Sequence, residues 1–237
     1  TSPTAARALA RAGLGGAAGP FLIPGAVDTD AFCPDTDGRP FRREMGFEAD
    51  DVVVGLVARW KKGRGLLEFL QAFALAAERE RALCALFIGR GELEPVLRAE
   101  AARLGLEGRA RLVSPGARFP EALAACDLGA LMRPGSDGSA RAALELMATA
   151  RAVVLWKYGS LVDLEGEEGA PRAVLCSSED ELAQALRHLA ASPDERARIG
   201  QAARAWVEAR HSMPRVRETL SAFALRAVKE ADASRLR

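Results

Sequence analysis

The sequence predicts an α/β domain: a doubly wound parallel sheet of about six strands with helices on both faces. Short apolar runs alternate with amphipathic stretches between positions 51 and 176. The runs are almost continuously apolar, which is typical of strands that are buried on both faces. The stretches between them carry apolar residues at helical spacing. Strands that alternate with helices in this way indicate parallel pairing through crossover connections.

Each expected element can be placed on the sequence. Strands are predicted at 51–58, 83–89, 110–114, 127–132, 152–156 and 172–176. Helical patterns follow the first four strands, at 66–80, 92–105, 120–126 and 140–150, and the segment 161–169 follows the fifth. After the sixth strand come helices at 177–192 and 192–211, with Ser178 and Ser192 as expected N-caps and Pro193 opening the second. A last helical pattern runs from 213 to 237, and the first 13 residues also have one.

Composition excludes several classes of function. Apolar residues make up 49% of the chain and charged residues 27%, a balance that supports a packed core. The formal net charge is only +1, so no overall field attracts nucleic acid or an anionic membrane. Four cysteines lie far apart without metal-ligand spacing, which indicates reduced core residues in a cytoplasmic protein. No apolar run reaches the roughly 20 residues that a transmembrane helix needs.

The loop after the first strand is strongly cationic. It reads ARWKKGRG and places Arg59, Lys61, Lys62 and Arg64 between a strand end and a helix start. Free N–H groups at a helix start already favour anions, so these side chains indicate a polyanionic ligand such as a diphosphate. A solvated basic turn is the alternative interpretation.

The loop after the fourth strand is small and rich in glycine. Its sequence RPGSDGSARAALELMATA would let backbone N–H groups approach a phosphate closely. Asp137 lies at the helix start and Glu145 about two turns later, so both carboxylates can project to one side. Alternatively, Asp137 caps the helix and Glu145 pairs with a nearby Arg, although its apolar neighbours make Glu145 less easy to explain in this way.

Two other strand ends give weaker signals. Gly89 and Gly91 follow the second strand, and Ser114 and Pro115 follow the third. Glycines commonly end strands, so Gly89 and Gly91 are given only a supporting role. Ser114 and Pro115, followed by Gly116, fit an ordinary turn better than a site. The absence of a GxGxxG motif after the first strand argues against a dinucleotide-binding oxidoreductase.

Taken together, these segments resemble the retaining glycosyltransferases called family 4 (group 1), which have the two-domain GT-B architecture. FLIPGAVDTDAF (21–32) is similar to the family's inter-domain stretch. VVGLVARWKKGRGLLEFLQAF resembles its first strand, phosphate-binding loop and helix, with Arg59 and Arg64 at the positions of the usual Arg and Lys. DLGALMRPGSDGSARAALELMATARAVVL (127–155) resembles the signature segment, whose two acidic residues are separated by seven others.

The resemblance assigns roles to single residues. Glu145 would bind the ribose hydroxyls and Asp137 would face the donor sugar. Amides of Gly138, Ser139 and Ala140 would meet sugar and phosphate. Members usually have Glu-Gly-Phe-Gly from the first acidic position, so the carboxylate here is one methylene shorter than usual.

The resemblance also implies a reaction. A sugar would pass from a UDP- or GDP-sugar to an acceptor with retention, without a required metal or other cofactor. Arg59, Arg64, Asp137 and Glu145 would be the catalytic residues. The two arginines would supply the positive charge that a metal supplies elsewhere. Lys62, Gly89, Gly91, Ser114 and Pro115 complete the expected donor-binding set.

The resemblance divides the chain into three parts. Residues 1–20 would be a remnant of the inter-domain helix and linker, and residues 21–211 the nucleotide-sugar-binding, Rossmann-like domain. Residues 212–237 would form a helix that crosses back to an N-terminal, acceptor-binding domain outside this chain. The apolar side chains on that helix are therefore expected to be partly exposed; they are Leu220, Phe223, Leu225 and Val228. Any association of this cytoplasmic, bacterial chain with the inner membrane would run through the N-terminal domain.

Two functions remain open on the sequence. The first is an enzyme fragment that binds a nucleotide sugar but does not turn over alone, because the acceptor half is missing. The second is a divergent, non-catalytic binding or scaffold module of the same fold. The altered Glu-Gly-Phe-Gly region favours the second, and the retained cations and Glu145 favour the first.

Overall fold

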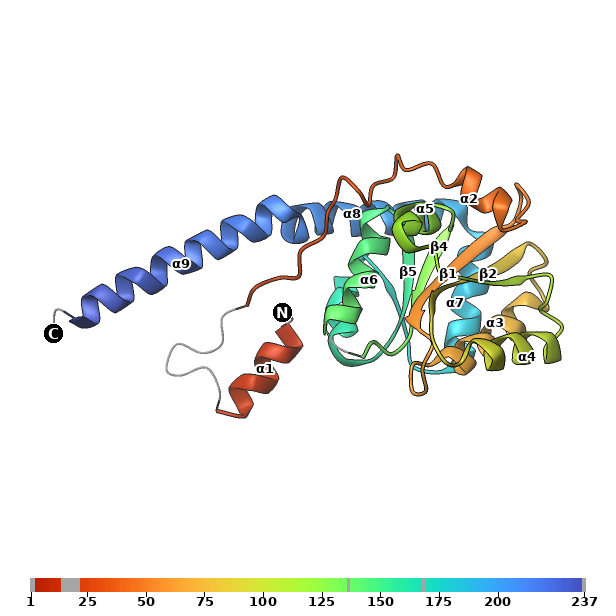
Figure 1. Ribbon diagram of the computed structural model, residues 1–237, viewed down its shortest axis with the longest axis horizontal. Coiled ribbons are helices and arrows are strands. Elements are labelled where there is room, and N and C mark those ends of the chain that lie inside the picture. Colours follow the sequence, from red (N-terminus) through yellow and green to blue (C-terminus); the bar gives the residue numbers. More distant parts are fainter. Residues whose placement is uncertain (1–2, 14–21, 136, 168, 236–237) are drawn as a thin grey trace.

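The computed structural model describes residues 3–13, 22–135, 137–167 and 169–235. At its centre lies a six-stranded sheet with the order β3-β2-β1-β4-β5-β8 (Figure 1). The strands are β1 (Val52–Arg59), β2 (Leu83–Arg90), β3 (Ala110–Val113), β4 (Leu128–Leu131), β5 (Ala152–Trp156) and β8 (Val174–Cys176). All neighbouring strands pair in parallel. The doubly wound sheet predicted from the sequence is confirmed.

Helices connect the strands and extend beyond them. They are α1 (Pro3–Arg11), α2 (Arg39–Glu44), α3 (Leu66–Ala77), α4 (Glu94–Arg103), α5 (Phe119–Ala124), α6 (Asp137–Ala148), α7 (Glu179–Ala191), α8 (Pro193–His211) and α9 (Met213–Arg235). As expected, Ser178 caps α7, where its hydroxyl accepts the Glu181 N–H at 3.2 Å. Ser192 is the N-cap of α8 by position, but its side chain makes no capping hydrogen bond.

Helices cover both faces of the sheet and form two cores. One core gathers Phe69 and Phe73 of α3 with Phe87 of β2 and Leu186 of α7. The other joins α2, α5, α6 and part of α8 to the opposite face. Alternation along a strand produces this division, since neighbouring side chains point to opposite faces. Leu86, next to Phe87, accordingly lies in the second core.

The order of the strands creates a switch point beside β1. From β1 the chain runs outward through β2 to β3, then returns to β4 on the other side of β1 and continues to β5 and β8. The loops after β1 and β4 therefore lead away in opposite directions and leave a crevice at the carboxyl ends of the strands. Doubly wound sheets bind their ligands at such points.

Between β5 and β8 the chain forms short elements in place of a long helix. A 3-10 helix, η2 (Gly159–Leu164), is followed by the antiparallel pair β6 (Gly166–Glu167) and β7 (Ala170–Pro171). Helix α1 packs against η2. A second 3-10 helix, η1 (Gly116–Arg118), precedes α5.

Arginines hold the loops at the amino-terminal edge of the sheet. The Arg109 guanidinium donates to the carbonyls of Ala77, Glu80 and Leu83. That of Arg151 donates to the carbonyls of Ala124, Cys126 and Thr149. Arg42 binds the carboxylate of Asp127 at 2.8 Å, and this carboxylate also accepts the N–H of Val53 at 2.7 Å. These guanidinium groups bind carbonyls at the helix ends and turns that lead into the strands.

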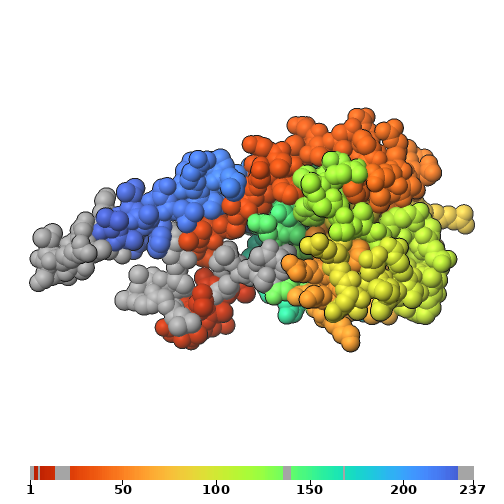
Figure 2. Space-filling view, in the orientation of Figure 1, coloured from red at the N-terminus to blue at the C-terminus, as the bar shows by residue number. Residues whose placement is uncertain are grey.

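Helix α9 projects from the body of the protein (Figures 1 and 2). Its apolar side chains are exposed as expected: Leu220 by 43%, Phe223 by 38%, Leu225 by 64% and Val228 by 59%. Among the helices that the structure describes, none is long and apolar enough to cross a membrane.

Candidate nucleotide-binding site

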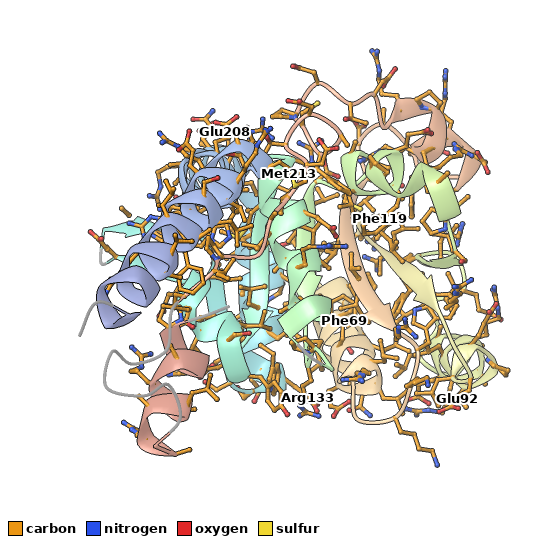
Figure 3. All side chains as sticks on the ribbon, turned by 60° about the vertical axis from the view of Figure 1, so that its left-hand side comes forward. Phe69, Glu92, Phe119, Arg133, Glu208 and Met213 are labelled. Carbon is orange, nitrogen blue, oxygen red and sulfur yellow. The ribbon has the colours of Figure 1, made fainter. Side chains whose placement is uncertain are left out.

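A cleft of about 500 Å³ opens at the carboxyl ends of β1 and β4, at the switch point of the sheet. The loop after β1 contributes Arg59, Lys61 and Arg64 to its lining, and the loop after β4 contributes residues 132–135. The structure therefore brings the cationic and the glycine-rich loop of the sequence together. In Figure 3, Arg133, from the loop after β4, lies near the bottom of the view and marks the edge of the sheet at which the cleft opens.

The two loops touch because glycines stand where they meet. Gly65 adopts a positive φ of 76°, and a Cβ there would lie 2.7 Å from the Cβ of Met132. A Cβ on Gly135 would lie 2.1 Å from a terminal nitrogen of Arg64. The Arg64 guanidinium thus lies directly against the backbone of the loop after β4. A cation and a bare backbone placed side by side suit a phosphate group.

The cleft has a positive charge excess. Among the described residues, no carboxylate forms an ion pair with Arg59, Lys61 or Arg64. Lys61 and Arg59 are exposed, whereas Arg64 is half-buried. Three cations that have no ion-pair partner in the described part of the chain gather near one helix start and form an electrostatic site for an anion.

Arg133 is a cleft residue that the sequence did not single out. Its guanidinium forms an ion pair with Glu68 of α3 at 2.6 Å and lies 5.5 Å from the ring centre of Trp156. These two contacts hold it at the mouth of the glycine-rich loop. The signal was its position directly beyond β4, but the partners that fix it lie far away in the sequence.

Glu145 is a buried residue of α6 and does not line the cleft. Only 8% of the residue is exposed, and its carboxylate accepts a hydrogen bond from Arg141 at 3.1 Å. Burial raises the pKa of Glu145, and the Arg141 charge opposes that shift. Because α6 is helical from Asp137 onward, Glu145 lies about 12 Å along the helix from its start. The pairing with a nearby Arg, the alternative interpretation of the sequence, is present.

The start of α6 is described only in its backbone. Asp137, Gly138 and Ser139 form its first residues, and their side chains lie outside the part of the chain that the structure describes. Ala140 is described and lines a second pocket on the outer side of the helix. The contacts expected of Asp137 therefore remain a prediction.

The other expected donor-binding residues that the structure describes do not line the cleft. Lys62 is exposed, and Ser114 and Pro115 follow β3, two strands away from β1. The glycines have a structural role. A Cβ on Gly89 would lie 1.9 Å from the carbonyl oxygen of Ala58, and one on Gly91 would meet the Trp60 backbone at 2.3 Å. They let the ends of β1 and β2 pack closely beside the cleft.

Comparison with known families decides the identity. The family described as glycosyl transferases group 1 matches residues 51–192, which covers the sheet from β1 to β8, the cleft and α7. The chain belongs to the group 1 glycosyl transferases. No curated protein matches its sequence at a significant level.

Solved structures give this glycosyltransferase chain its place in the GT-B architecture. It is similar to Anabaena HepE in complex with UDP and glucose, with 23% identity, a TM-score of 0.81 and coverage of 94% of this chain and 61% of HepE. It is also similar to the C-terminal domain of LpcC, a group 1 family protein from Francisella tularensis. There the identity is 20% and the TM-score 0.68, with coverage of 79% of this chain and all of the other. The fold is thus that of a GT-B C-terminal domain, and the chain spans about three fifths of the length of HepE.

Proposed function

We propose that this glycosyltransferase chain binds the donor of a sugar transfer, a UDP- or GDP-sugar, and that the complete enzyme moves the sugar to an acceptor with retention. The observation that carries the proposal is the contact between Arg64 and Gly135. It joins a cation that forms no ion pair among the described residues to a bare backbone, in a cleft at the switch point of the sheet. The diphosphate of the donor is the ligand chemistry that such a contact fits.

The donor lies with its diphosphate against Arg59 and Arg64 in this proposal. As the bond between the sugar and the diphosphate breaks, negative charge grows on the departing phosphate oxygen. Both guanidinium groups then stabilise that charge more strongly than they stabilise the intact donor. Asp137 faces the sugar, and the nucleoside extends along α6 toward Glu145.

Similar proteins support a nucleotide ligand. HepE has been crystallised with UDP-glucose, and that structure shares 26% identity with this chain over 93% of its length, with a TM-score of 0.77. It supports uracil as the first base to test.

Among the described residues there is no group of three or more His, Cys, Asp or Glu side chains that could hold a metal ion.

Thermal unfolding with added nucleotide tests the proposal. UDP, GDP and ADP, and the corresponding glucose conjugates, are titrated against the chain. A ligand at about 100 times its dissociation constant stabilises the folded state by about 2.7 kcal/mol. The diphosphate and the glucose conjugate of one of the three bases are expected to raise the Tm by several degrees. This rise should disappear in an Arg59→Ala, Arg64→Ala double variant. If none of the six ligands changes the Tm, the chain is not a nucleotide-sugar-binding domain.

The second candidate is a non-catalytic module that binds the nucleotide without using it. The observation that favours it is the Arg141–Glu145 pair, which occupies the carboxylate expected to bind ribose. Donor consumption by a protein that also carries an N-terminal acceptor domain separates the two candidates. An enzyme releases nucleoside diphosphate when acceptor is present, whereas a module binds the donor and leaves it intact.

A further inference from the structure

A second pocket lies away from the cleft. Its volume is about 570 Å³, and its walls come from the chain around Pro24, the outer side of α6, η2, and the junction of α8 with α9. It has no lining residue in common with the cleft. In Figure 3, Met213 at the α8–α9 junction lies near the top of the view and Arg133 of the cleft at the bottom.

Cations outnumber carboxylates in this pocket. Four arginines line it, against two acidic residues, Asp163 and Glu218. Glu218 is paired with Arg215 at 3.0 Å, and Asp163 accepts hydrogen bonds from Thr4. Both carboxylates therefore already have partners.

The four guanidinium groups differ in their ionic partners. Arg141 pairs with Glu145 and Arg215 with Glu218. Within the described part of the chain, no carboxylate forms an ion pair with Arg172 or Arg210. These two remain as neighbouring positive charges in one concave site.

The guanidinium group of Arg172 packs against an aromatic ring, but one of its N–H donors has no acceptor in the described structure. Its guanidinium lies 4.7 Å from the ring centre of Trp206, which is itself 4.5 Å from the His211 ring. The Nε of Arg172 is buried and has no hydrogen-bond partner in the described structure. Burial lowers the pKa of Arg172 and the charge of Arg210 lowers it further, while the more distant carboxylate of Glu167, which forms no ion pair with it, opposes the shift. A buried donor without a partner, beside a like charge, is costly unless a ligand supplies an acceptor.

We propose that this pocket binds the phosphate group of a small phosphorylated compound, held between Arg172 and Arg210. A phosphate dianion neutralises both cations and offers several oxygen acceptors, and guanidinium groups bind such oxygens through paired hydrogen bonds. The volume leaves room for an organic portion, for which Leu22, Pro24 and Leu144 offer an apolar wall. The site does not depend on the nucleotide bound in the cleft.

The tryptophans allow the two sites to be observed separately. Trp206 belongs to the pocket, whereas Trp156 lies beside Arg133 of the cleft. With the indole nitrogens labelled by ¹⁵N, inorganic phosphate is titrated into the full chain, first alone and then with saturating UDP. The Trp206 signal is expected to shift in a saturable way in both titrations, and UDP alone should shift Trp156.

Variants test the two arginines. Arg210→Gln changes an exposed side chain and should not disturb folding, and it is expected to weaken phosphate binding at Trp206 at least about tenfold. Arg172→Gln should weaken it as much. Arg98→Gln, which breaks an exposed pair on α4, is the matched control and should leave binding unchanged.

Several results would overturn the proposal. They are an unmoved Trp206 signal, unchanged affinity in Arg210→Gln, or a Trp206 response that UDP abolishes. A phosphate response confined to Trp156 would place the anion in the cleft instead. Acetate that binds as tightly as phosphate would show that the pocket has no preference for phosphate.

Discussion

The carboxylate of Asp163 in η2 caps α1 through two hydrogen bonds from Thr4. The Thr4 N–H donates at 3.0 Å and its hydroxyl at 2.8 Å. First-turn amides of a helix have no partner within the helix, and a carboxylate near them also interacts well with the helix dipole. The usual cap comes from the residue before the helix, but here it comes from a residue 159 positions away. Asp163 thus fastens α1 to the domain.

Removal of that cap should release α1. Asp163→Ala is expected to cost about 0.5–2 kcal/mol of α1 docking, the range measured for N-caps. Trypsin should then cut after Arg7 several-fold faster, as peptide mapping over time will show. Thr4→Ser retains both donors and should be cut like the unchanged chain. Equal cleavage in Asp163→Ala and the unchanged chain would mean that other contacts hold the helix.

A methyl group at Gly135 should affect the ligand and spare the fold. In Gly135→Ala the new Cβ collides with the Arg64 guanidinium, the movable end of a flexible side chain. Arg64 is displaced from the loop after β4, so nucleotide affinity should fall about tenfold while the Tm stays nearly constant. Gly108→Ala, where a Cβ meets nothing within 4 Å, is the control for both measurements. A Gly135→Ala variant that binds UDP normally would remove the contact that carries the proposed function.

The cations of the cleft should differ in their contributions. Arg59→Ala or Arg64→Ala is expected to cost roughly 2–5 kcal/mol of nucleotide binding. Lys61→Ala should cost less, because the ammonium group of Lys61 lacks the paired donors of a guanidinium. Calorimetric titration with UDP, or with the nucleotide that the Tm screen selects, measures all three. Equal affinities in the three variants would contradict this order.

Glu145 should lower stability at neutral pH. Burial raises its folded-state pKa above the ordinary 4.5, so the folded chain holds the proton more tightly than the unfolded chain does. Stability therefore falls as the pH rises through the interval above 4.5. Glu145→Gln is expected to raise the Tm at pH 7 and to change it little at pH 4, while weakening nucleotide binding if the carboxylate holds the ribose. A Tm gain that is the same at both pH values would exclude this linkage.

His211 should make the α8–α9 junction sensitive to acid. Its Nδ1–H donates to the Gly25 carbonyl at 2.9 Å. Burial lowers its pKa below 6.5, the Gly25 hydrogen bond opposes the shift, and Arg210 adds to it. The unfolded chain thus takes up the proton first, and stability is lost as the pH falls below about 6.5. Between pH 7.5 and 5, the Tm of His211→Gln should fall less than that of the unchanged chain. His188→Gln, on the exposed side of α7, is the control, and its Tm should fall as much as that of the unchanged chain.

Local patterns predicted most of the fold. β1 and β2 were placed within a residue or two, because a strand buried on both faces is marked by an apolar run that needs no distant partner. The Ser178 cap was visible for the same reason, since its hydrogen bond spans three residues. The segment around η2 gave no comparable signal, because two-residue strands such as β6 leave almost no periodicity in the sequence.

The site was predicted in outline and missed in detail. Arg59 and Arg64 could be identified because parallel strand ends bring such loops to one edge. Arg133 could not, because its place depends on Glu68 in α3, and two residues 65 positions apart give no signal in a single sequence. The proximity of Arg172 and Arg210 is likewise a property of packing, since the two residues lie far apart in the sequence and meet only at the pocket.

The arginines at the amino-terminal edge of the sheet support the fold, whereas the cations proposed to bind the ligand lie at the other edge. Stability and ligand affinity therefore depend on different residues. Arg109 and Arg151 each hold three carbonyls, a task that needs several fixed donors, and lysine would leave some of those oxygens without a partner. At the opposite edge, Arg59, Lys61 and Arg64 form no ion pair within the described part of the chain. If each arginine is exchanged for lysine in turn, substitutions at the amino-terminal edge should therefore lower the Tm. Substitutions in the cleft should instead lower the affinity for the ligand.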